Sequence, residues 1–167
     1  GVAAVKEGDP KQSGIDMGPV IDEMAAAEIE ARLKEAVSLG GRILTGGNRI
    51  GTMVAPTVID HVDERAKLIR TETFGPVLAI RTFTDSDAAI EEVNRSGFGL
   101  QAGIYSNDHR EIRKFSRQLQ VGGVMINEGP DFRAEHVPFG GVKKSGLGRE
   151  GIRIAIREMS ETKVVIY

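Results

Sequence analysis

The run Gly146-Leu147-Gly148-Arg149-Glu150-Gly151 fits the pattern G-x-G-x-x-G, which can cradle a dinucleotide pyrophosphate. That role requires a strand immediately before the pattern and an acidic residue about 20 positions after it, at a second strand end. The preceding segment, residues 136–145, instead contains a proline, two glycines and two lysines. We therefore predict a tight glycine turn that leads into a helix, where glycine is needed for positive φ and close packing.

The chain contains no cysteine, so it holds no disulfide, no thiolate metal ligand and no cysteine nucleophile. His61 and His109 lie among acidic residues and lack a second histidine at metal-ligand spacing. We predict no metal site.

The bulk composition is that of a soluble globular protein, with 40% hydrophobic and 28% charged residues. A net charge of −2 without a basic run gives no electrostatic footprint for nucleic acid. No apolar run approaches the roughly 18 residues that a membrane span needs. We expect a cytoplasmic protein that binds neither nucleic acid nor membrane.

The elements that must position any site begin with a helix after Asp22, a good N-cap residue. Ile29, Leu33 and Val37 follow at i, i+4 and i+8, and Gly40-Gly41 supplies a stop. Residues 42–46 and 53–60 favour short strands, and Pro56 argues for an edge or bulge position in the second.

The middle of the chain is regular. Residues 77–83, 100–105 and 122–127 favour strands, and the segments between them favour two capped amphipathic helices, the first with Ala89, Ile90 and Val93 inward. Two βαβ units of this spacing predict an α/β fold: a three-stranded parallel sheet with right-handed crossovers and flanking helices. Ligands of such sheets gather at the carboxyl ends of the strands, which the glycine-rich run after Asn127 follows directly.

Near the end of the chain, residues 149–159 favour a helix with an apolar stripe of Ile152, Ile156 and Met159. Val164 to Tyr167 is a short apolar strand, which we expect to add to a sheet edge of this chain or of a neighbouring subunit.

Three motifs together resemble the aldehyde dehydrogenase superfamily: "ETFGPV" at residues 72–77, "VMIN" at 124–127 and "PFGGVKKSGLGREG" at 138–151. With "EGDP" and "GPVID" near the start, the resemblance extends over essentially the whole chain, and it is to the C-terminal part of such an enzyme. It implies that residues 1–160 form part of the catalytic domain, truncated at its N-terminal side, and that residues 161–167 form a strand for oligomerisation.

In this family a cysteine attacks the aldehyde, hydride passes to NAD or NADP, and a glutamate activates the water that hydrolyses the thioester. The resemblance places both residues and the dinucleotide-binding domain upstream, so we expect no catalytic nucleophile or base in this chain and no turnover by the chain alone. The complete enzyme is expected to be a homo-oligomer, either a dimer or a tetramer. The alternative is a naturally truncated, non-catalytic module that pairs with full-length subunits through its last strand.

The resemblance also implies individual roles. Glu72 matches the family residue that accepts hydrogen bonds from the ribose hydroxyls beside the nicotinamide, and Phe74 matches one that presses on the nicotinamide ring. Asn127, by contrast, is expected to be structural, with its side chain satisfying turn amides.

On the substrate side, Phe139 matches a residue that lines the aldehyde tunnel, with core packing as the alternative. Arg133 and His136 lie in the segment that the family places at the substrate entrance, in a pattern similar to the branch acting on lactaldehyde, phosphonoacetaldehyde or glyceraldehyde 3-phosphate. Arg133 is either an anchor for an anionic group on a small aldehyde or a member of a surface ion pair with Asp131 or Glu135.

Overall fold

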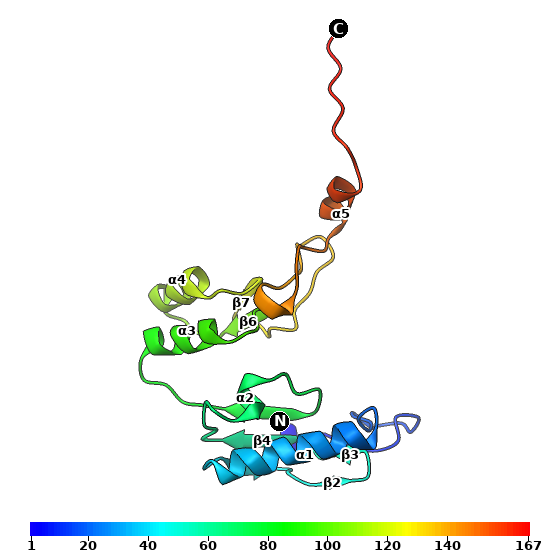
Figure 1. Ribbon diagram of the computed structural model, residues 1–167, viewed down its shortest axis with the longest axis vertical. Helices are drawn as coiled ribbons and strands as arrows, with labels where there is room; N and C mark the ends of the chain where they lie inside the picture. The colour runs from blue at the N-terminus through cyan, green and yellow to red at the C-terminus, as the bar shows by residue number, and fades with distance from the viewer. The chain divides into compact units, whose positions relative to one another are not determined.

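The computed structural model describes residues 1–167, which divide into two compact units, Gly1–Thr82 and Phe83–Tyr167 (Figure 1). The first contains η1 (Val2–Ala4), α1 (Glu23–Ser38), β1 (Arg42–Thr45), β2 (Arg49–Ile50), β3 (Met53–Val54), β4 (Thr57–Asp60), α2 (Lys67–Arg70) and β5 (Val77–Ile80). The second contains α3 (Ser86–Arg95), β6 (Gln101–Ile104), α4 (His109–Gln118), β7 (Gly123–Ile126), η2 (Lys143–Ser145) and α5 (Ile152–Glu158). No helix is both long enough and apolar enough to cross a membrane.

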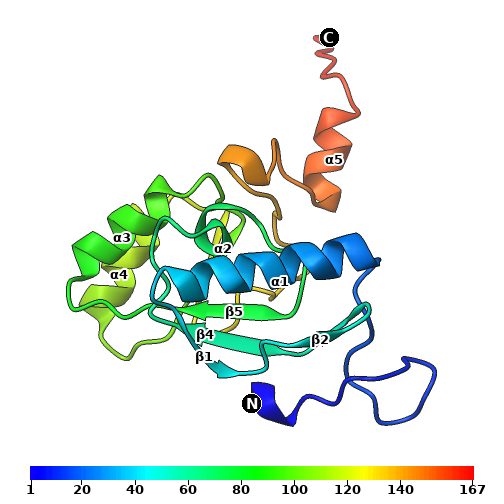
Figure 2. The same cartoon turned by 60° about the horizontal axis from the view of Figure 1, so that its bottom comes forward.

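The first unit is built on a sheet of order β1-β4-β5 with α1 lying along it (Figure 2). β1 pairs antiparallel with β4, and β4 pairs in parallel with β5, with Thr57 opposite Val77. The prediction of one strand over residues 53–60 with Pro56 at an edge or bulge is wrong: Pro56 lies between β3 and β4, which belong to different sheets. β2 and β3 form a separate hairpin.

Helix α1 begins where predicted, because the Asp22 carboxylate accepts a hydrogen bond from the Ala25 amide at 2.7 Å. Its buried face differs in part from the prediction. Ile29 and Leu33 are buried, whereas Val37 is 44% exposed. Two alanines complete the face instead, since a small side chain lets the helix approach the sheet closely.

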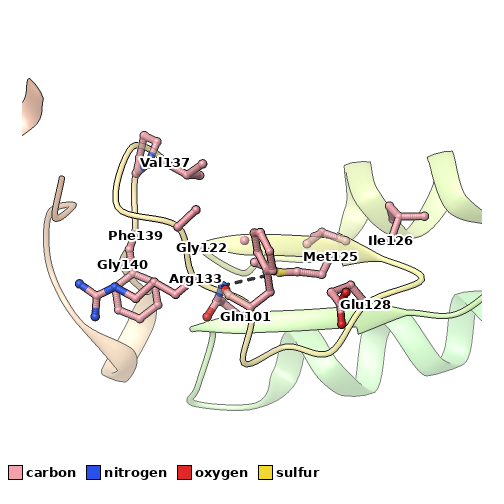
Figure 3. A pocket seen from close by; sticks show the side chains of 14 residues that line it. Gln101, Gly122, Met125, Ile126, Glu128, Arg133, Val137, Phe139 and Gly140 are labelled. Carbon is pink, nitrogen blue, oxygen red and sulfur yellow. Dashed lines mark hydrogen bonds between the residues drawn. The ribbon is translucent and has the colours of Figure 1, made fainter. Parts of the chain in front are cut away.

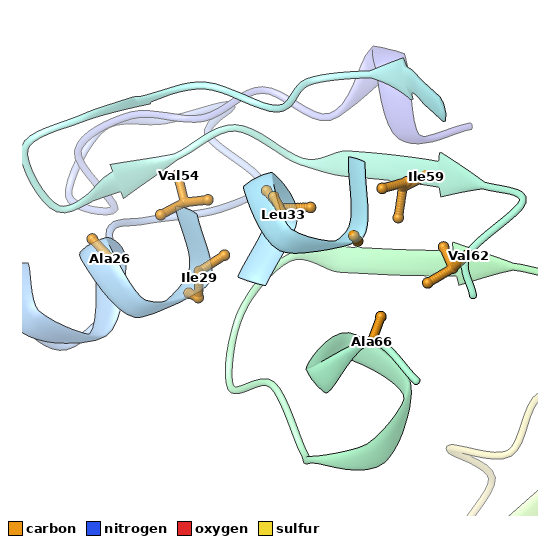
Figure 4. Packing of buried hydrophobic residues seen from close by; sticks show 8 residues of the cluster. Ala26, Ile29, Leu33, Val54, Ile59, Val62 and Ala66 are labelled. Carbon is orange, nitrogen blue, oxygen red and sulfur yellow. The ribbon is translucent and has the colours of Figure 1, made fainter. Parts of the chain in front are cut away.

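The core of the first unit lies between α1, the strands and the segment before α2 (Figure 4). Ile59, at the centre of the sheet, is fully buried. The complete cluster of buried residues is Ala26, Ile29, Leu33, Ala36, Val54, Ile59, Val62 and Ala66. By the usual scale, each fully buried isoleucine, leucine or valine of the cluster contributes about 1.5–3 kcal/mol.

In the second unit β6 and β7 pair in parallel, with Gln101 opposite Gly123 and Ile104 opposite Ile126. Helices α3 and α4 each begin at an aspartate cap, Asp85 and Asp108. The two helices are tied together by Ser86, which donates a hydrogen bond to Glu111 at 2.6 Å, and by the Lys114–Asp87 ion pair at 2.8 Å.

The α/β prediction is confirmed, with a difference in how the strands are grouped. The structure contains two βαβ units, β4-α2-β5 and β6-α4-β7, in two different sheets. The prediction of one continuous sheet from β5, β6 and β7 differs because it took α3 as the crossover from β5. β5 already has a parallel partner in β4, reached through the four-residue helix α2 that the sequence pattern did not reveal.

Residues 160–167 form no helix or strand and pair with no strand of this chain, so the predicted strand Val164–Tyr167 is not formed here. Its side chains are exposed, from 59% for Val165 upwards. The predicted helix before it is confirmed as α5, and its apolar stripe is exposed as well, with Ile152 at 66% and Ile156 at 60%. Without a paired strand, this segment runs extended (Figure 1).

Candidate cofactor loop and substrate cavity

Glu72 and Phe74, the predicted cofactor residues, lie in the loop between α2 and β5, where both side chains are exposed. The Phe74 ring is 82% exposed. The loop backbone, in contrast, is tied down: the Glu72 carbonyl accepts a hydrogen bond from the Arg32 guanidinium at 2.6 Å. The loop therefore presents two side chains from a fixed backbone.

The other end of the same loop is fixed by close packing. A Cβ atom on Gly75 would lie 2.4 Å from Cδ1 of Ile29, so a larger residue there would require the Ile29 side chain on α1 to shift. The next residue, Pro76, accepts a hydrogen bond from the Thr57 amide at 2.8 Å, which joins the loop to β4. In "ETFGP", the glycine is thus explained by its packing against α1, and the proline lies where the chain enters the sheet.

The second unit contains a cavity of about 500 Å³ beside β7 and the segment that follows it (Figure 3). Two predicted substrate residues, Arg133 and Phe139, line this cavity. His136 does not line it and is exposed to solvent, so the structure does not bring it together with the other two. Phe132 and Gln101 also line the cavity, and the sequence prediction missed them.

Arg133 lies at the cavity with its guanidinium 4.3 Å from the centre of the Phe139 ring, a cation–π contact. Its ion-pair partner is Glu150, with Nη2 of Arg133 2.6 Å from the Glu150 carboxylate. The predicted partners Asp131 and Glu135 are therefore wrong. The reason is the antiparallel bridge between Phe139 and Glu150, which brings two residues distant in sequence to the same place.

Both side chains of this ion pair remain partly in solvent, with Arg133 55% and Glu150 68% exposed. Exposed pairs of this kind contribute only about 0–1 kcal/mol. A guanidinium has five N–H donors, and a single short contact to Glu150 leaves others for a further anion. Stacking on Phe139 fixes the plane in which those donors lie.

The glycine run after the cavity is a turn, as predicted. Gly146, Gly148 and Gly151 all have positive φ, at 147°, 71° and 140°, and Gly151 is the residue before α5. Asn127 is structural, as predicted, because its side-chain oxygen accepts a hydrogen bond from the Ser106 amide at 2.9 Å. Its own φ of 55° ends β7 in the left-handed region that asparagine tolerates.

A family model described as "Aldehyde dehydrogenase family" matches residues 1–165. The chain is 48% identical over 159 residues to a lactaldehyde dehydrogenase of Methanococcus maripaludis, covering 95% of this chain and 34% of that protein. It is 41% identical over 159 residues to a 3-sulfolactaldehyde dehydrogenase of Priestia aryabhattai, covering 95% of this chain and 33% of that protein.

Solved structures agree. Aldehyde dehydrogenase 21 from Physcomitrella patens, in complex with its reaction product succinate, superposes with a TM-score of 0.92 at 41% identity, covering 98% of this chain and 34% of that one. A glyceraldehyde-3-phosphate dehydrogenase from Methanocaldococcus jannaschii, complexed with NADP, gives a TM-score of 0.89 at 39% identity, covering 96% of this chain and 35% of that one. The chain spans about a third of the length of these relatives. In sequence and in fold, the chain belongs to the aldehyde dehydrogenase family.

Proposed function

We propose that this chain is the C-terminal portion of an NAD- or NADP-dependent aldehyde dehydrogenase that oxidises a small aldehyde bearing an anionic group. The observation that carries the anionic specificity is Arg133, which lines a cavity of about 500 Å³ and is held against Phe139. That volume suits a small molecule. Relatives named for 3-sulfolactaldehyde and sulfoacetaldehyde support an anionic substrate, and one named for the neutral lactaldehyde supports a small aldehyde only.

The cofactor loop fits a nicotinamide nucleotide. When bound, this cofactor supplies the hydride acceptor for the oxidation. The Glu72 carboxylate is exposed and able to accept two ribose hydroxyl donors, and the exposed Phe74 ring offers a flat apolar face to a planar ring. Their task is orientation, since a fixed geometry of the reacting atoms is worth several orders of magnitude in rate.

On the substrate side, the Arg133 guanidinium would bind the far end of the aldehyde through charge-assisted hydrogen bonds. Phe139 contributes twice: its ring lines the cavity, and its face holds the guanidinium. Gln101 supports the wall, because its amide donates a hydrogen bond to the Phe132 carbonyl at 3.1 Å. His136, which lies outside the cavity lining, is assigned no substrate contact.

The cysteine nucleophile must come from elsewhere in the intact enzyme, since the sequence contains no cysteine, and we propose that the glutamate base lies there as well. We therefore propose that the chain alone does not turn over. Its exposed residues 161–167 would add a strand to a neighbouring subunit, giving a dimer or tetramer. The alternative, a non-catalytic module that joins full-length subunits, is favoured by the same exposed segment. An aldehyde-dependent assay of the native gene product distinguishes them, because only the enzyme reduces NAD(P).

The anionic specificity is tested in the intact enzyme with lactaldehyde and 3-sulfolactaldehyde, which differ by one sulfonate. Arg133→Met should lower kcat/KM for the sulfonated aldehyde about ten- to hundredfold, because a hydrogen bond to a charged group is worth about 1.5–3 kcal/mol. Activity with lactaldehyde should stay within about twofold of wild type.

The matched control is Arg153→Met, which removes an exposed arginine on α5 that does not line the cavity. It should leave both activities unchanged. An Arg133→Met enzyme that keeps the wild-type ratio between the two aldehydes would refute the anion anchor.

A further inference from the structure

Arg32 links the middle of α1 to the loop of residues 71–76, the candidate cofactor loop that carries Glu72 and Phe74. One of its terminal nitrogens, Nη1, donates to the Glu72 carbonyl at 2.6 Å and to the Thr73 hydroxyl at 2.8 Å. These contacts join positions 40 and 41 residues apart in the sequence. The side chain is only 13% exposed, so its bonds are partly shielded from competition by water.

The orientation of this guanidinium is set by its own helix. Its second terminal nitrogen, Nη2, is 2.5 Å from the carboxylate of Glu28, one turn earlier on α1. A planar group bound at both ends cannot rotate without losing one of its partners. Arg32 therefore connects the helix to the loop in a fixed orientation.

Arg32 contacts the part of the loop that carries the exposed side chains. Arg32 holds the backbone at Glu72 and Thr73, and Ile29, on the same helix, is packed against Gly75. Phe74 lies between the two attachment points with its ring 82% exposed. A loop held on both sides of an exposed ring has little freedom to move that ring.

We propose that Arg32 is a positioning residue for the nicotinamide cofactor: it makes no contact with the cofactor and fixes the backbone from which Glu72 and Phe74 reach it. This inference rests on the proposed cofactor role of those two residues. A misplacement of about 1 Å from a distant substitution can cost about a hundredfold in rate.

The test uses the intact enzyme and the variants Arg32→Gln, Arg32→Lys and Thr73→Val. The readouts are the Kd for reduced cofactor from fluorescence titration, kcat, and amide hydrogen exchange of residues 73–75 and 77 without cofactor. Arg32→Gln should raise the Kd about tenfold, lower kcat about ten- to hundredfold and speed exchange in the loop. Its KM for aldehyde should stay within about twofold of wild type.

Two further variants protect the test against a simple folding defect. Thr73→Val removes one hydrogen-bond acceptor of Arg32 and leaves the arginine itself in place, so it should give a smaller effect in the same direction. Arg32→Lys keeps the positive charge but lacks the planar guanidinium with its several N–H donors, so the Kd of this variant should lie between those of wild type and Arg32→Gln. The matched control is Arg49→Gln, which breaks a similar partly buried pair between β2 and Glu30 on α1, away from the loop, and should leave the Kd unchanged.

A mutant cycle separates positioning from general destabilisation. If Arg32 acts through Glu72 and Phe74, adding Arg32→Gln to an enzyme that already carries Glu72→Gln and Phe74→Ala should raise the Kd by less than about twofold further. Provided that Glu72→Gln alone weakens cofactor binding, two results would overturn the inference. One is that the separate increases in Kd multiply when the substitutions are combined; the other is that Arg32→Gln has the same Kd as Arg49→Gln. If Glu72→Gln binds the cofactor as wild type does, the proposed role of Glu72 is wrong and the inference falls with it.

Discussion

Lys143 offers a sharp test of how the segment after the cavity is held in place. Its ammonium donates to the backbone carbonyls of Asn94, Ser96 and Phe98 at 2.9, 3.1 and 3.2 Å, around the C-terminal end of α3. Its backbone has φ of 57°, an unfavourable value for a residue other than glycine. We infer that the side-chain hydrogen bonds of Lys143 stabilise the fold by more than its positive φ costs.

The magnitude follows from those contacts. A hydrogen bond from a charged donor contributes about 1.5–3 kcal/mol, and a cation at a helix C-terminus adds about 0.3–1 kcal/mol. Three bonds that share one half-buried ammonium do not add, and desolvation of that group opposes them. We therefore expect Lys143→Met to cost about 2 kcal/mol in the free energy of local opening.

Amide hydrogen exchange in the intact enzyme measures this local free energy. The reporters are the amides of Val142 and residue 144, which donate to the carbonyls of Gly99 and Gly97 at 3.0 Å. A loss of about 2 kcal/mol should speed their exchange roughly 30-fold. Lys143→Gly should be less severe, because glycine relieves the strain of positive φ. The control, Lys144→Met at the exposed neighbour, should change little; equal effects of Lys143→Met and Lys144→Met would refute the reasoning.

Three further outcomes are expected. Gly75→Ala should destabilise the first unit by about 1–3 kcal/mol in chemical denaturation, and adding Ile29→Val, which removes the clashing methyl group, should recover part of the loss; no recovery would contradict the packing argument. Glu150→Gln should lower KM for 3-sulfolactaldehyde and not for lactaldehyde in steady-state assays, because it frees Arg133 from a competing carboxylate; an unchanged KM would exclude that competition. Arg65 holds the pKa of Asp63 well below its ordinary value of 3.8, so the ion pair stabilises the fold above that value and the contribution is lost as pH falls below it. The Tm difference between wild type and Asp63→Asn should therefore shrink as pH falls below about 4, and a difference independent of pH would contradict the linkage.

Local signals in the sequence were sufficient for the starts of α1, α3 and α4 and for several turns. Asp22 could be recognised as a cap from its type and position, since capping involves only neighbouring residues. The left-handed glycines of the run 146–151 were likewise predictable from residue type. Periodicity alone could not distinguish Val37 from Ala36 as the buried residue, because that depends on how closely α1 approaches the sheet.

The candidate site residues could be named from motifs, and their roles stay predictions; the contacts that hold them could not be named. Glu72 and Phe74 are identified by "ETFGP", yet nothing local to Arg32 indicates that it reaches the loop, because only the tertiary fold brings them together. The same holds for Arg133, whose partner Glu150 is 17 residues away and is brought close by a backbone bridge. Long-range partners of charged residues are set by topology, which the sequence pattern describes only coarsely.

The most direct test of the central claim is the rate of NAD(P)H formation by the purified intact enzyme with lactaldehyde and with 3-sulfolactaldehyde. The account predicts aldehyde-dependent reduction of the cofactor and a higher kcat/KM for the sulfonated substrate, because Arg133 lines the cavity. A protein that forms no NAD(P)H with either aldehyde, or that favours lactaldehyde, would contradict it.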